Sequence, residues 1–285
     1  MLTVEEIRQI RRLHVQAGRR VDSLLGGEYR SAFKGSGMEF EEVRQYVPGD
    51  DVRRIDWNVT ARSEEPWIKL FREERELTLL LVLDVSGSMR FGSGGRDGRT
   101  DKRLQLSRLA GGLAYAALRS HDRVGLVSFS DRVERVVPPR KSRGHGWAVI
   151  RATFETASEG HRTDLAQALG LANRLLKRRA VVVILSDFIN PTPFSRPLAA
   201  LVRRHRVHAL LVHDPREAAM PDLGLLSVED AETGATLTVD TGKLSSSMPV
   251  SARVEELRRV GVRTTSVSTD EDAFLRLHLH FRGGR

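Results

Sequence analysis

Cysteine is absent from this chain of 285 residues. Its absence excludes disulfide bonds, thiolate nucleophiles, zinc–cysteine clusters and iron–sulfur ligation. A metal ion could therefore bind only through oxygen or imidazole ligands. Long apolar runs are also absent, since the longest are residues 79–83 and 180–185 and a membrane-spanning helix needs about 20 apolar residues. The sequence MLTVEEIRQIRR at the N-terminus is charged early and lacks an apolar signal segment, so we expect a soluble, cytoplasmic protein.

Lysine and aromatic residues are scarce, although the formal net charge is +9. Such a charge favours a nucleic-acid partner. Only six of the 46 basic side chains are lysines, however, and a skew toward arginine is expected from a GC-rich genome. The densest basic stretch, residues 138–146 (PPRKSRGHG), is predicted to be a loop and has no aromatic residue to stack on bases. We expect a solvated surface there and keep nucleic-acid binding through Arg140, Lys141 and Arg143 as the alternative.

Residues 1–75 form a segment whose pattern differs from the remainder of the chain. Within it, residues 39–62 (EFEEVRQYVPGDDVRRIDWNVTAR) mix charged and apolar side chains, and the Pro-Gly pair at 48–49 suits the centre of a type II turn. We expect this segment to pack on the main domain as a structural collar. Partner docking through Trp57 and Arg62 is the alternative, because tryptophan and arginine are frequent anchors of interfaces.

From residue 76 to 285, the pattern alternates between strands and helices. The expected strands are residues 77–83, 123–129, 132–137, 180–185, 207–212 and 262–267. The expected helices are residues 104–118, 147–156, 165–176, 250–260 and a terminal one from 271. Several of the strands are continuous apolar runs, which are typical of parallel strands buried on both faces. The order predicts a doubly wound, mostly parallel α/β sheet, interrupted by a β-hairpin insertion at residues 216–247.

Hydroxyl and carboxylate side chains follow the buried strands. The first apolar strand ends in the sequence DVSGS, the strand at 180–185 ends in Ser-Asp, and a loop before residue 165 contains Arg-Thr-Asp. Ligands of open α/β sheets collect beyond the carboxyl ends of the strands. Hard oxygen ligands suit Mg²⁺ or Mn²⁺. The candidate metal ligands are Asp84, Ser86, Ser88, Thr163 and Asp187.

This pattern resembles the von Willebrand factor A domain, in which the five positions form a metal-ion-dependent adhesion site. The resemblance implies that Ser86, Ser88 and Thr163 bind the metal through their hydroxyl groups. It implies that Asp84 and Asp187 bind it directly or through water. An Asp or Glu of a partner protein would complete the coordination.

The block upstream of the first apolar strand adds a second resemblance. Together with the later DVSGSM, it is similar to the bacterial "domain of unknown function 58" family, whose members carry an A-like domain. The matching positions are Glu39-Phe40, Arg44, Tyr46, Gly49-Asp50-Asp51, Arg53, Ile55-Asp56-Trp57 and Ala61-Arg62. Members of that family are often associated with MoxR-type AAA+ ATPases, which implies a role as an adaptor or assembly partner.

Two other interpretations apply to the same residues. Asp84, Ser86 and Ser88 are common helix caps, and we expect Asp164 to cap the helix that follows it. A strand that ends in Asp beside Mg²⁺ is also typical of phosphotransferases, but these have a second Asp two residues later, where this chain has Ser86. We therefore expect no enzymatic activity. The histidines, which lack the spacing of a zinc-binding helix, are expected to be structural or surface residues.

These inferences together predict a non-catalytic module for metal-dependent protein recognition. The serine and threonine hydroxyls are neutral donors, so much of the charge of a bound cation would remain to attract a carboxylate. Arg162, beside Thr163, would add to that attraction. A MoxR-type ATPase is the partner that the family resemblance implies.

Overall fold

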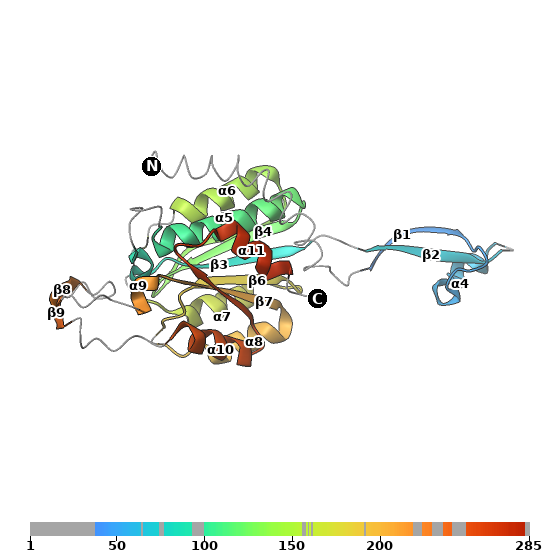
Figure 1. Ribbon diagram of the computed structural model, residues 1–285. Coiled ribbons are helices and arrows are strands. Elements are labelled where there is room, and N and C mark those ends of the chain that lie inside the picture. The colour runs from blue at the N-terminus through green and yellow to red at the C-terminus, as the bar shows by residue number, and fades with distance from the viewer. Residues whose placement is uncertain are drawn as a thin grey trace. The chain divides into compact units, whose positions relative to one another are not determined.

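The structure is a computed structural model that describes residues 38–63, 65–73, 77–92, 100–155, 158, 160, 162–190, 192–218, 224–229, 236–240 and 249–282 (Figure 1). Its contacts divide the chain into two units, one of which is Phe33–Glu76 and the other of which contains Leu77–Arg285. Each unit is described by itself. The predicted packing of residues 1–75 on the main domain therefore stays a prediction.

The smaller unit is built on two antiparallel strands, β1 (Met38–Gln45) and β2 (Trp67–Glu73). A turn with Gly49 at a φ of +111° and a hydrogen bond from the Asp50 amide to the Val47 carbonyl follows β1, as the Pro-Gly pair predicted. Two short helices come next, η2 (Val52–Arg54) and α4 (Trp57–Thr60), each capped by an aspartate at its N-terminus. Local capping and turn formation thus account for the shape of this dense block.

The larger unit contains a six-stranded sheet in the order β10-β7-β6-β3-β4-β5. Its strands are β3 (Thr78–Asp84), β4 (Arg123–Phe129), β5 (Val133–Arg140), β6 (Val181–Ser186), β7 (Arg206–His213) and β10 (Arg263–Ser268). All neighbouring strands are parallel except β4 and β5. The predicted mostly parallel α/β sheet is therefore confirmed.

Helices cover both faces of this sheet (Figure 1). On one face lie α5 (Lys102–Arg119), α6 (Arg143–Glu155) and α11 (Ala273–Arg282). On the other face lie α7 (Leu165–Leu175), α8 (Ser195–Arg204) and α10 (Val250–Arg259). The short helices η3 (Gly87–Arg90) and α9 (Pro215–Ala218) follow β3 and β7. The chain thus forms three layers, with the sheet between two layers of helices.

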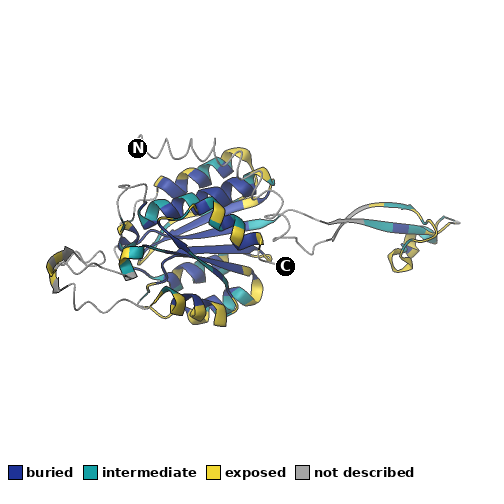
Figure 2. Ribbon diagram, in the orientation of Figure 1, coloured by how far each residue is buried: buried dark blue, intermediate teal, exposed yellow. Residues whose placement is uncertain are grey.

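The core lies between the sheet and these helices (Figure 2). Strands β3 and β6 are buried along nearly their whole length, which explains their continuous apolar sequences. The side chains of α7, α8 and α10 that face the sheet, such as Leu169, Leu201 and Leu257, pack into the same cluster as Val82 and Ile184. Because β3 and β6 are paired in parallel, their carboxyl ends lie at one edge of the sheet.

The predicted hairpin is present as β8 (Leu225–Glu229) paired antiparallel with β9 (Thr236–Asp240), and the residues that connect them lie outside the described part. A histidine pair is buried between β7 and α11, where Nδ1 of His208 lies 2.8 Å from Nε2 of His280. Among the described residues, no helix has both the length and the apolar character needed to cross a bilayer.

Candidate metal centre

Asp84 is the last residue of β3 and is 1% exposed. Its Oδ1 accepts hydrogen bonds from the backbone amide of Ser86 at 3.0 Å and from the Ser86 hydroxyl at 2.6 Å. The hydroxyl oxygens of Ser86 and Ser88 lie 3.3 Å apart. Ser86 stands at the N-cap position of η3, yet its side chain makes no capping hydrogen bond. Its hydroxyl therefore serves the cluster around Asp84 and not the helix.

The end of β6 adjoins this loop because β3 and β6 are paired in parallel, with Leu83 opposite Leu185. The Ser186 hydroxyl donates to Oδ2 of Asp84 at 2.6 Å, and the next residue, Asp187, is completely buried. Sequence reasoning did not assign Ser186 to the site. Its position could have indicated this role, because it precedes Asp187 at the carboxyl end of a buried strand.

Thr163 reaches the same edge through β4. The backbone amide of Asp164 donates to the Ser130 carbonyl at 2.8 Å, while the amide of Val85 donates to the carbonyl of Phe129, the last residue of β4. The backbone beside Thr163 and the backbone that follows Asp84 are therefore bonded to two adjacent residues, Ser130 and Phe129. Thr163 is buried and Arg162 beside it is exposed.

Asp164 has the capping role that its residue type predicted. Its Oδ1 accepts a hydrogen bond from the Gln167 amide at 3.1 Å, so it caps the N-terminus of α7. The prediction that Asp164 is a cap is confirmed. The adjacent residues Thr163 and Asp164 thus have separate roles, one at the sheet edge and one on the helix.

A lysine that sequence reasoning missed lies at this edge. The Nζ of Lys102, in the first turn of α5, lies 2.8 Å from Oδ2 of Asp187 and also forms an ion pair with Glu217 of α9. Burial alone would lower the pKa of Lys102, but the charges of the two carboxylates outweigh burial and raise it above its ordinary value. No local pattern marks this residue, since its partners are 85 and 115 positions away.

The two aspartates of the cluster have different electrostatic surroundings. Asp187 is paired with Lys102, whereas Asp84 makes no ion pair with the residues that the structure describes. Burial, and next the charge of Asp187, raise the pKa of Asp84 to about 6, although hydrogen bonds from Ser186 and Ser86 act in the opposite direction. The negative charge of Asp84 is therefore costly in the absence of a nearby cation.

The backbone after β6 holds Asp187 in place. Phe188 has a φ of +56°, a left-handed conformation that costs a non-glycine residue about 1–2 kcal/mol. Its amide donates to the Ser186 hydroxyl, and the Ile189 amide donates to Oδ1 of Asp187 at 2.9 Å. Nη1 of the buried Arg253 donates to the Asp187 carbonyl. Hydrogen bonds on both sides fix this strained turn. Such strain is consistent with a need to hold the Asp187 carboxylate in one position.

The donor set fits a small, hard divalent cation. Asp84, Ser86, Ser88, Thr163 and Asp187 offer only carboxylate and hydroxyl oxygens, which are ligands of Mg²⁺ and Mn²⁺. The described part of the chain has no group of three or more His, Cys, Asp or Glu side chains placed to hold a metal ion. Binding at this edge would therefore depend on the hydroxyl groups.

Two further residues singled out from the sequence, Trp57 and Arg62, belong to the smaller unit. Trp57 is 70% exposed on α4, and Arg62 is also exposed. Among the three residues predicted to contact a partner, Arg162 is the one that belongs to the same unit as the candidate metal centre.

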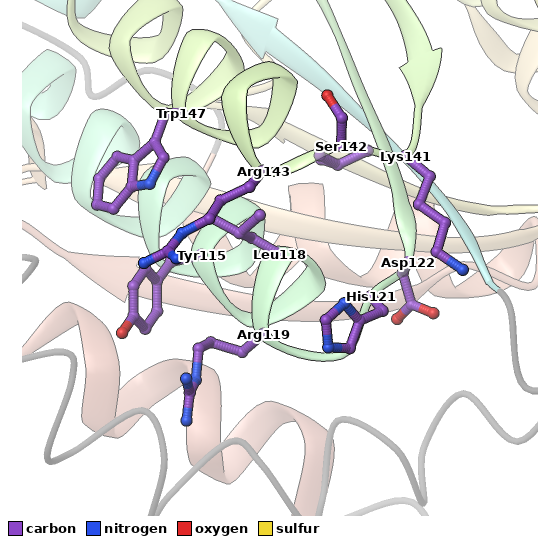
Figure 3. Close-up of a pocket in the computed structure, with 10 residues that line it drawn as sticks. Tyr115, Leu118, Arg119, His121, Asp122, Lys141, Ser142, Arg143 and Trp147 are labelled. Atoms are coloured by element: carbon purple, nitrogen blue, oxygen red, sulfur yellow. The ribbon is translucent and has the colours of Figure 1, made fainter.

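A pocket of about 320 Å³ lies at the opposite edge of the sheet, where α5 ends and β4 begins (Figure 3). The prediction of a loop at residues 138–146 is wrong, because this basic stretch spans the end of β5, a two-residue connection and the first turn of α6. Lys141 and Arg143 of the stretch line the pocket together with Arg119 and His121. The rings of Tyr115 and Trp147 meet edge to face there, with centroids 6.3 Å apart. The basic stretch is therefore separated from the candidate metal centre by the length of α5.

The family described as "Protein of unknown function DUF58" matches residues 42–258. The chain belongs to this family. An uncharacterized protein of Mycobacterium tuberculosis (strain H37Rv) is 37% identical to this DUF58 chain over 227 residues, which are 79% of this chain and 70% of the relative. An uncharacterized protein of Mycobacterium avium is 43% identical over 108 residues, or 36% of this chain and 64% of the relative.

Solved structures with the same fold have little sequence identity to this DUF58 chain. The conserved hypothetical protein BatB from Bacteroides thetaiotaomicron aligns with a TM-score of 0.50 and 15% identity over 73% of this chain and 98% of its own. An aerotolerance-related membrane protein from Bacteroides fragilis aligns with a TM-score of 0.51 and 17% identity over 73% and 99%. At such identities the likeness supports the α/β fold alone.

Proposed function

We propose that this DUF58 chain is a non-catalytic protein-interaction module of von Willebrand A type that depends on Mg²⁺ or Mn²⁺. The observation that carries the proposal is the convergence of Asp84, Ser86 and Ser88 with Thr163 and Asp187 at one sheet edge. Three separate segments supply these residues. Helix capping would account for one such residue, but the Ser86 side chain makes no capping bond.

The five proposed ligands differ in charge. The hydroxyls of Ser86, Ser88 and Thr163 are neutral donors, and the carboxylates of Asp84 and Asp187 supply the negative charge. A bound divalent cation would offer an open coordination position to a carboxylate of a partner. Arg162, exposed next to Thr163, would draw the same carboxylate toward the site through its charge.

A partner with an acidic side chain fits this arrangement. The family resemblance points to a MoxR-type AAA+ ATPase, and cytoplasmic localisation remains part of the same proposal. Binding of the purified ATPase should require Mg²⁺ or Mn²⁺, and it should be lost when EDTA removes the metal. Equal affinity with and without metal would contradict metal-dependent recognition.

The metal centre itself is tested by thermal unfolding with and without millimolar Mg²⁺ or Mn²⁺. A ligand that binds only the native state stabilises it by about 2.7 kcal/mol at 100 times its Kd. We expect the wild type to gain a Tm increase of several degrees, and Asp84→Ala and Ser86→Ala to lose this increase. Asp164→Ala is the control, because it removes a cap and no proposed ligand. An unchanged Tm in the wild type would contradict the presence of the centre.

A further inference from the structure

Lys102 is placed where only its two carboxylate partners offset the cost of burying an ammonium group. It is 1% exposed, and it is the first residue of α5, directly after the N-cap residue Asp101. Burial disfavours an ammonium group, and so does the positive end of a helix dipole. A buried ion pair is also weak evidence for a stabilising role, since desolvation offsets the attraction. The position of Lys102 is therefore better explained by an action on its neighbours.

The neighbours of Lys102 belong to the candidate metal centre and to the element beside it. Its Nζ lies 2.8 Å from Oδ2 of Asp187, and the Ile189 amide occupies Oδ1 of the same carboxylate. Glu217, whose side chain is partly exposed on α9, forms a second ion pair with the same ammonium group. A divalent cation that binds Asp187 would therefore lie close to the ammonium group that is already paired with this carboxylate.

We propose that Lys102 is a tethered cation that competes with the divalent ion for Asp187, and that Glu217 sets the strength of this competition. The inference rests on the proposed function, because it concerns the affinity of the same centre. Like charges repel strongly at short range in a partly buried site. Glu217 partly neutralises the ammonium and so reduces its repulsion of the metal ion.

This competition would couple metal binding to partner binding. With Lys102 in place, Asp84 is the proposed carboxylate ligand whose charge is not shared with an ammonium group. The metal ion is therefore held weakly until a partner adds a carboxylate. By linkage, the metal and the partner raise the affinity of the centre for each other by the same factor.

The test is titration with Mn²⁺, measured by the electron paramagnetic resonance signal of the free ion at fixed pH and ionic strength. Lys102→Met removes the ammonium and should tighten Mn²⁺ binding about tenfold or more. Glu217→Gln leaves the ammonium opposed by Asp187 alone and should weaken binding several-fold. A lysine that is merely structural predicts lower metal-free Tm values for both variants but the same Mn²⁺ affinity.

Each outcome decides a different claim. If the wild type binds Mn²⁺ and both folded variants bind it equally well, competition is overturned and the proposed function stands. If Lys102→Met binds Mn²⁺ and the wild type does not, competition is supported and metal binding by the native protein without a partner is overturned. If no protein binds Mn²⁺, both are overturned. Should Lys102→Met fail to fold, an unchanged affinity of Glu217→Gln overturns competition by itself.

Discussion

Thr163 and Asp164 are adjacent residues whose side chains belong to different structures. Asp164 bonds to the Gln167 amide at the start of α7, while Thr163 is buried at the sheet edge. At the scale of single residues, the chain therefore offers a matched pair of substitutions. One changes the proposed centre and the other changes only a helix terminus.

Thr163→Ala should abolish the stabilisation by Mg²⁺ because it removes one of the three proposed hydroxyl ligands. Asp164→Ala should lower the free energy of unfolding by about 1 kcal/mol, the usual effect of losing an N-cap, and should keep the stabilisation by Mg²⁺. Chemical denaturation of both variants with and without Mg²⁺ measures the two effects. Retention of the Mg²⁺ effect in Thr163→Ala would remove this residue from the proposed ligand set.

At the scale of elements, Ser158 and Gly160, which lie between α6 and α7, bond to a carboxylate of β5. Oε1 of Glu134 accepts hydrogen bonds from the Ser130 hydroxyl at 2.5 Å, the Gly160 amide at 2.9 Å and the Ser158 hydroxyl at 3.2 Å. Space is tight there, since a Cβ atom added to Gly160 would lie 2.3 Å from the Ser130 hydroxyl oxygen. Glu134 thus anchors two residues that closely precede Thr163 in the chain.

Glu134→Gln should weaken Mg²⁺ binding several-fold, because an amide oxygen is a weaker acceptor than a carboxylate and holds these two residues less firmly. Glu155→Gln is the control. It removes a carboxylate of the same region whose ion pairs, with Arg135 and Arg151, lie at the surface. Calorimetric titration with Mg²⁺ compares the two variants. Equal affinities would show that Mg²⁺ binding does not depend on Glu134.

At the scale of the whole molecule, buried ionisable groups make stability depend on pH. Burial lowers the pKa of His208 to about 3, and that of His280 well below its ordinary value of 6.5. Both therefore remain neutral in the native state while the unfolded chain takes up protons below about pH 6.5. The stability they provide is present above pH 6.5 and is lost as the pH falls toward 3. Asp84 acts oppositely, since its raised pKa favours the native state as the pH falls from about 6 to 3.8.

His208→Asn removes one titrating group, and an asparagine side chain places a polar atom near the position of Nδ1, which faces His280 in the wild type. Between pH 6.5 and 4, His208 alone should lower the free energy of unfolding by about 1.4 kcal/mol per pH unit. The variant should show a correspondingly flatter acid limb, and subtraction of the two curves cancels the contribution of Asp84. Urea denaturation at several pH values measures both curves. Parallel curves would contradict a neutral buried His208.

Local pattern determined the elements and their order. Continuous apolar runs predicted β3, β6 and β7, because strands buried on both faces need apolar residues at every position. The same logic placed Asp84 and Asp187 at one edge, since parallel strands end on the same side of a sheet. The Pro-Gly turn and the Asp164 cap followed from the chemistry of single residues. The elements, the turn and the cap depend on neighbours within a few positions, so the sequence by itself determined them.

Tertiary structure alone decided which polar groups meet. Lys102 pairs with residues 85 and 115 positions away, and His208 meets His280 across 72 positions. Ser186 bonds to Asp84 across 102 positions. The local sequence around a lysine at the start of a helix does not indicate whether its side chain is solvated or buried. The difference arises from desolvation and from partners that only the packed sheet and helices bring within reach.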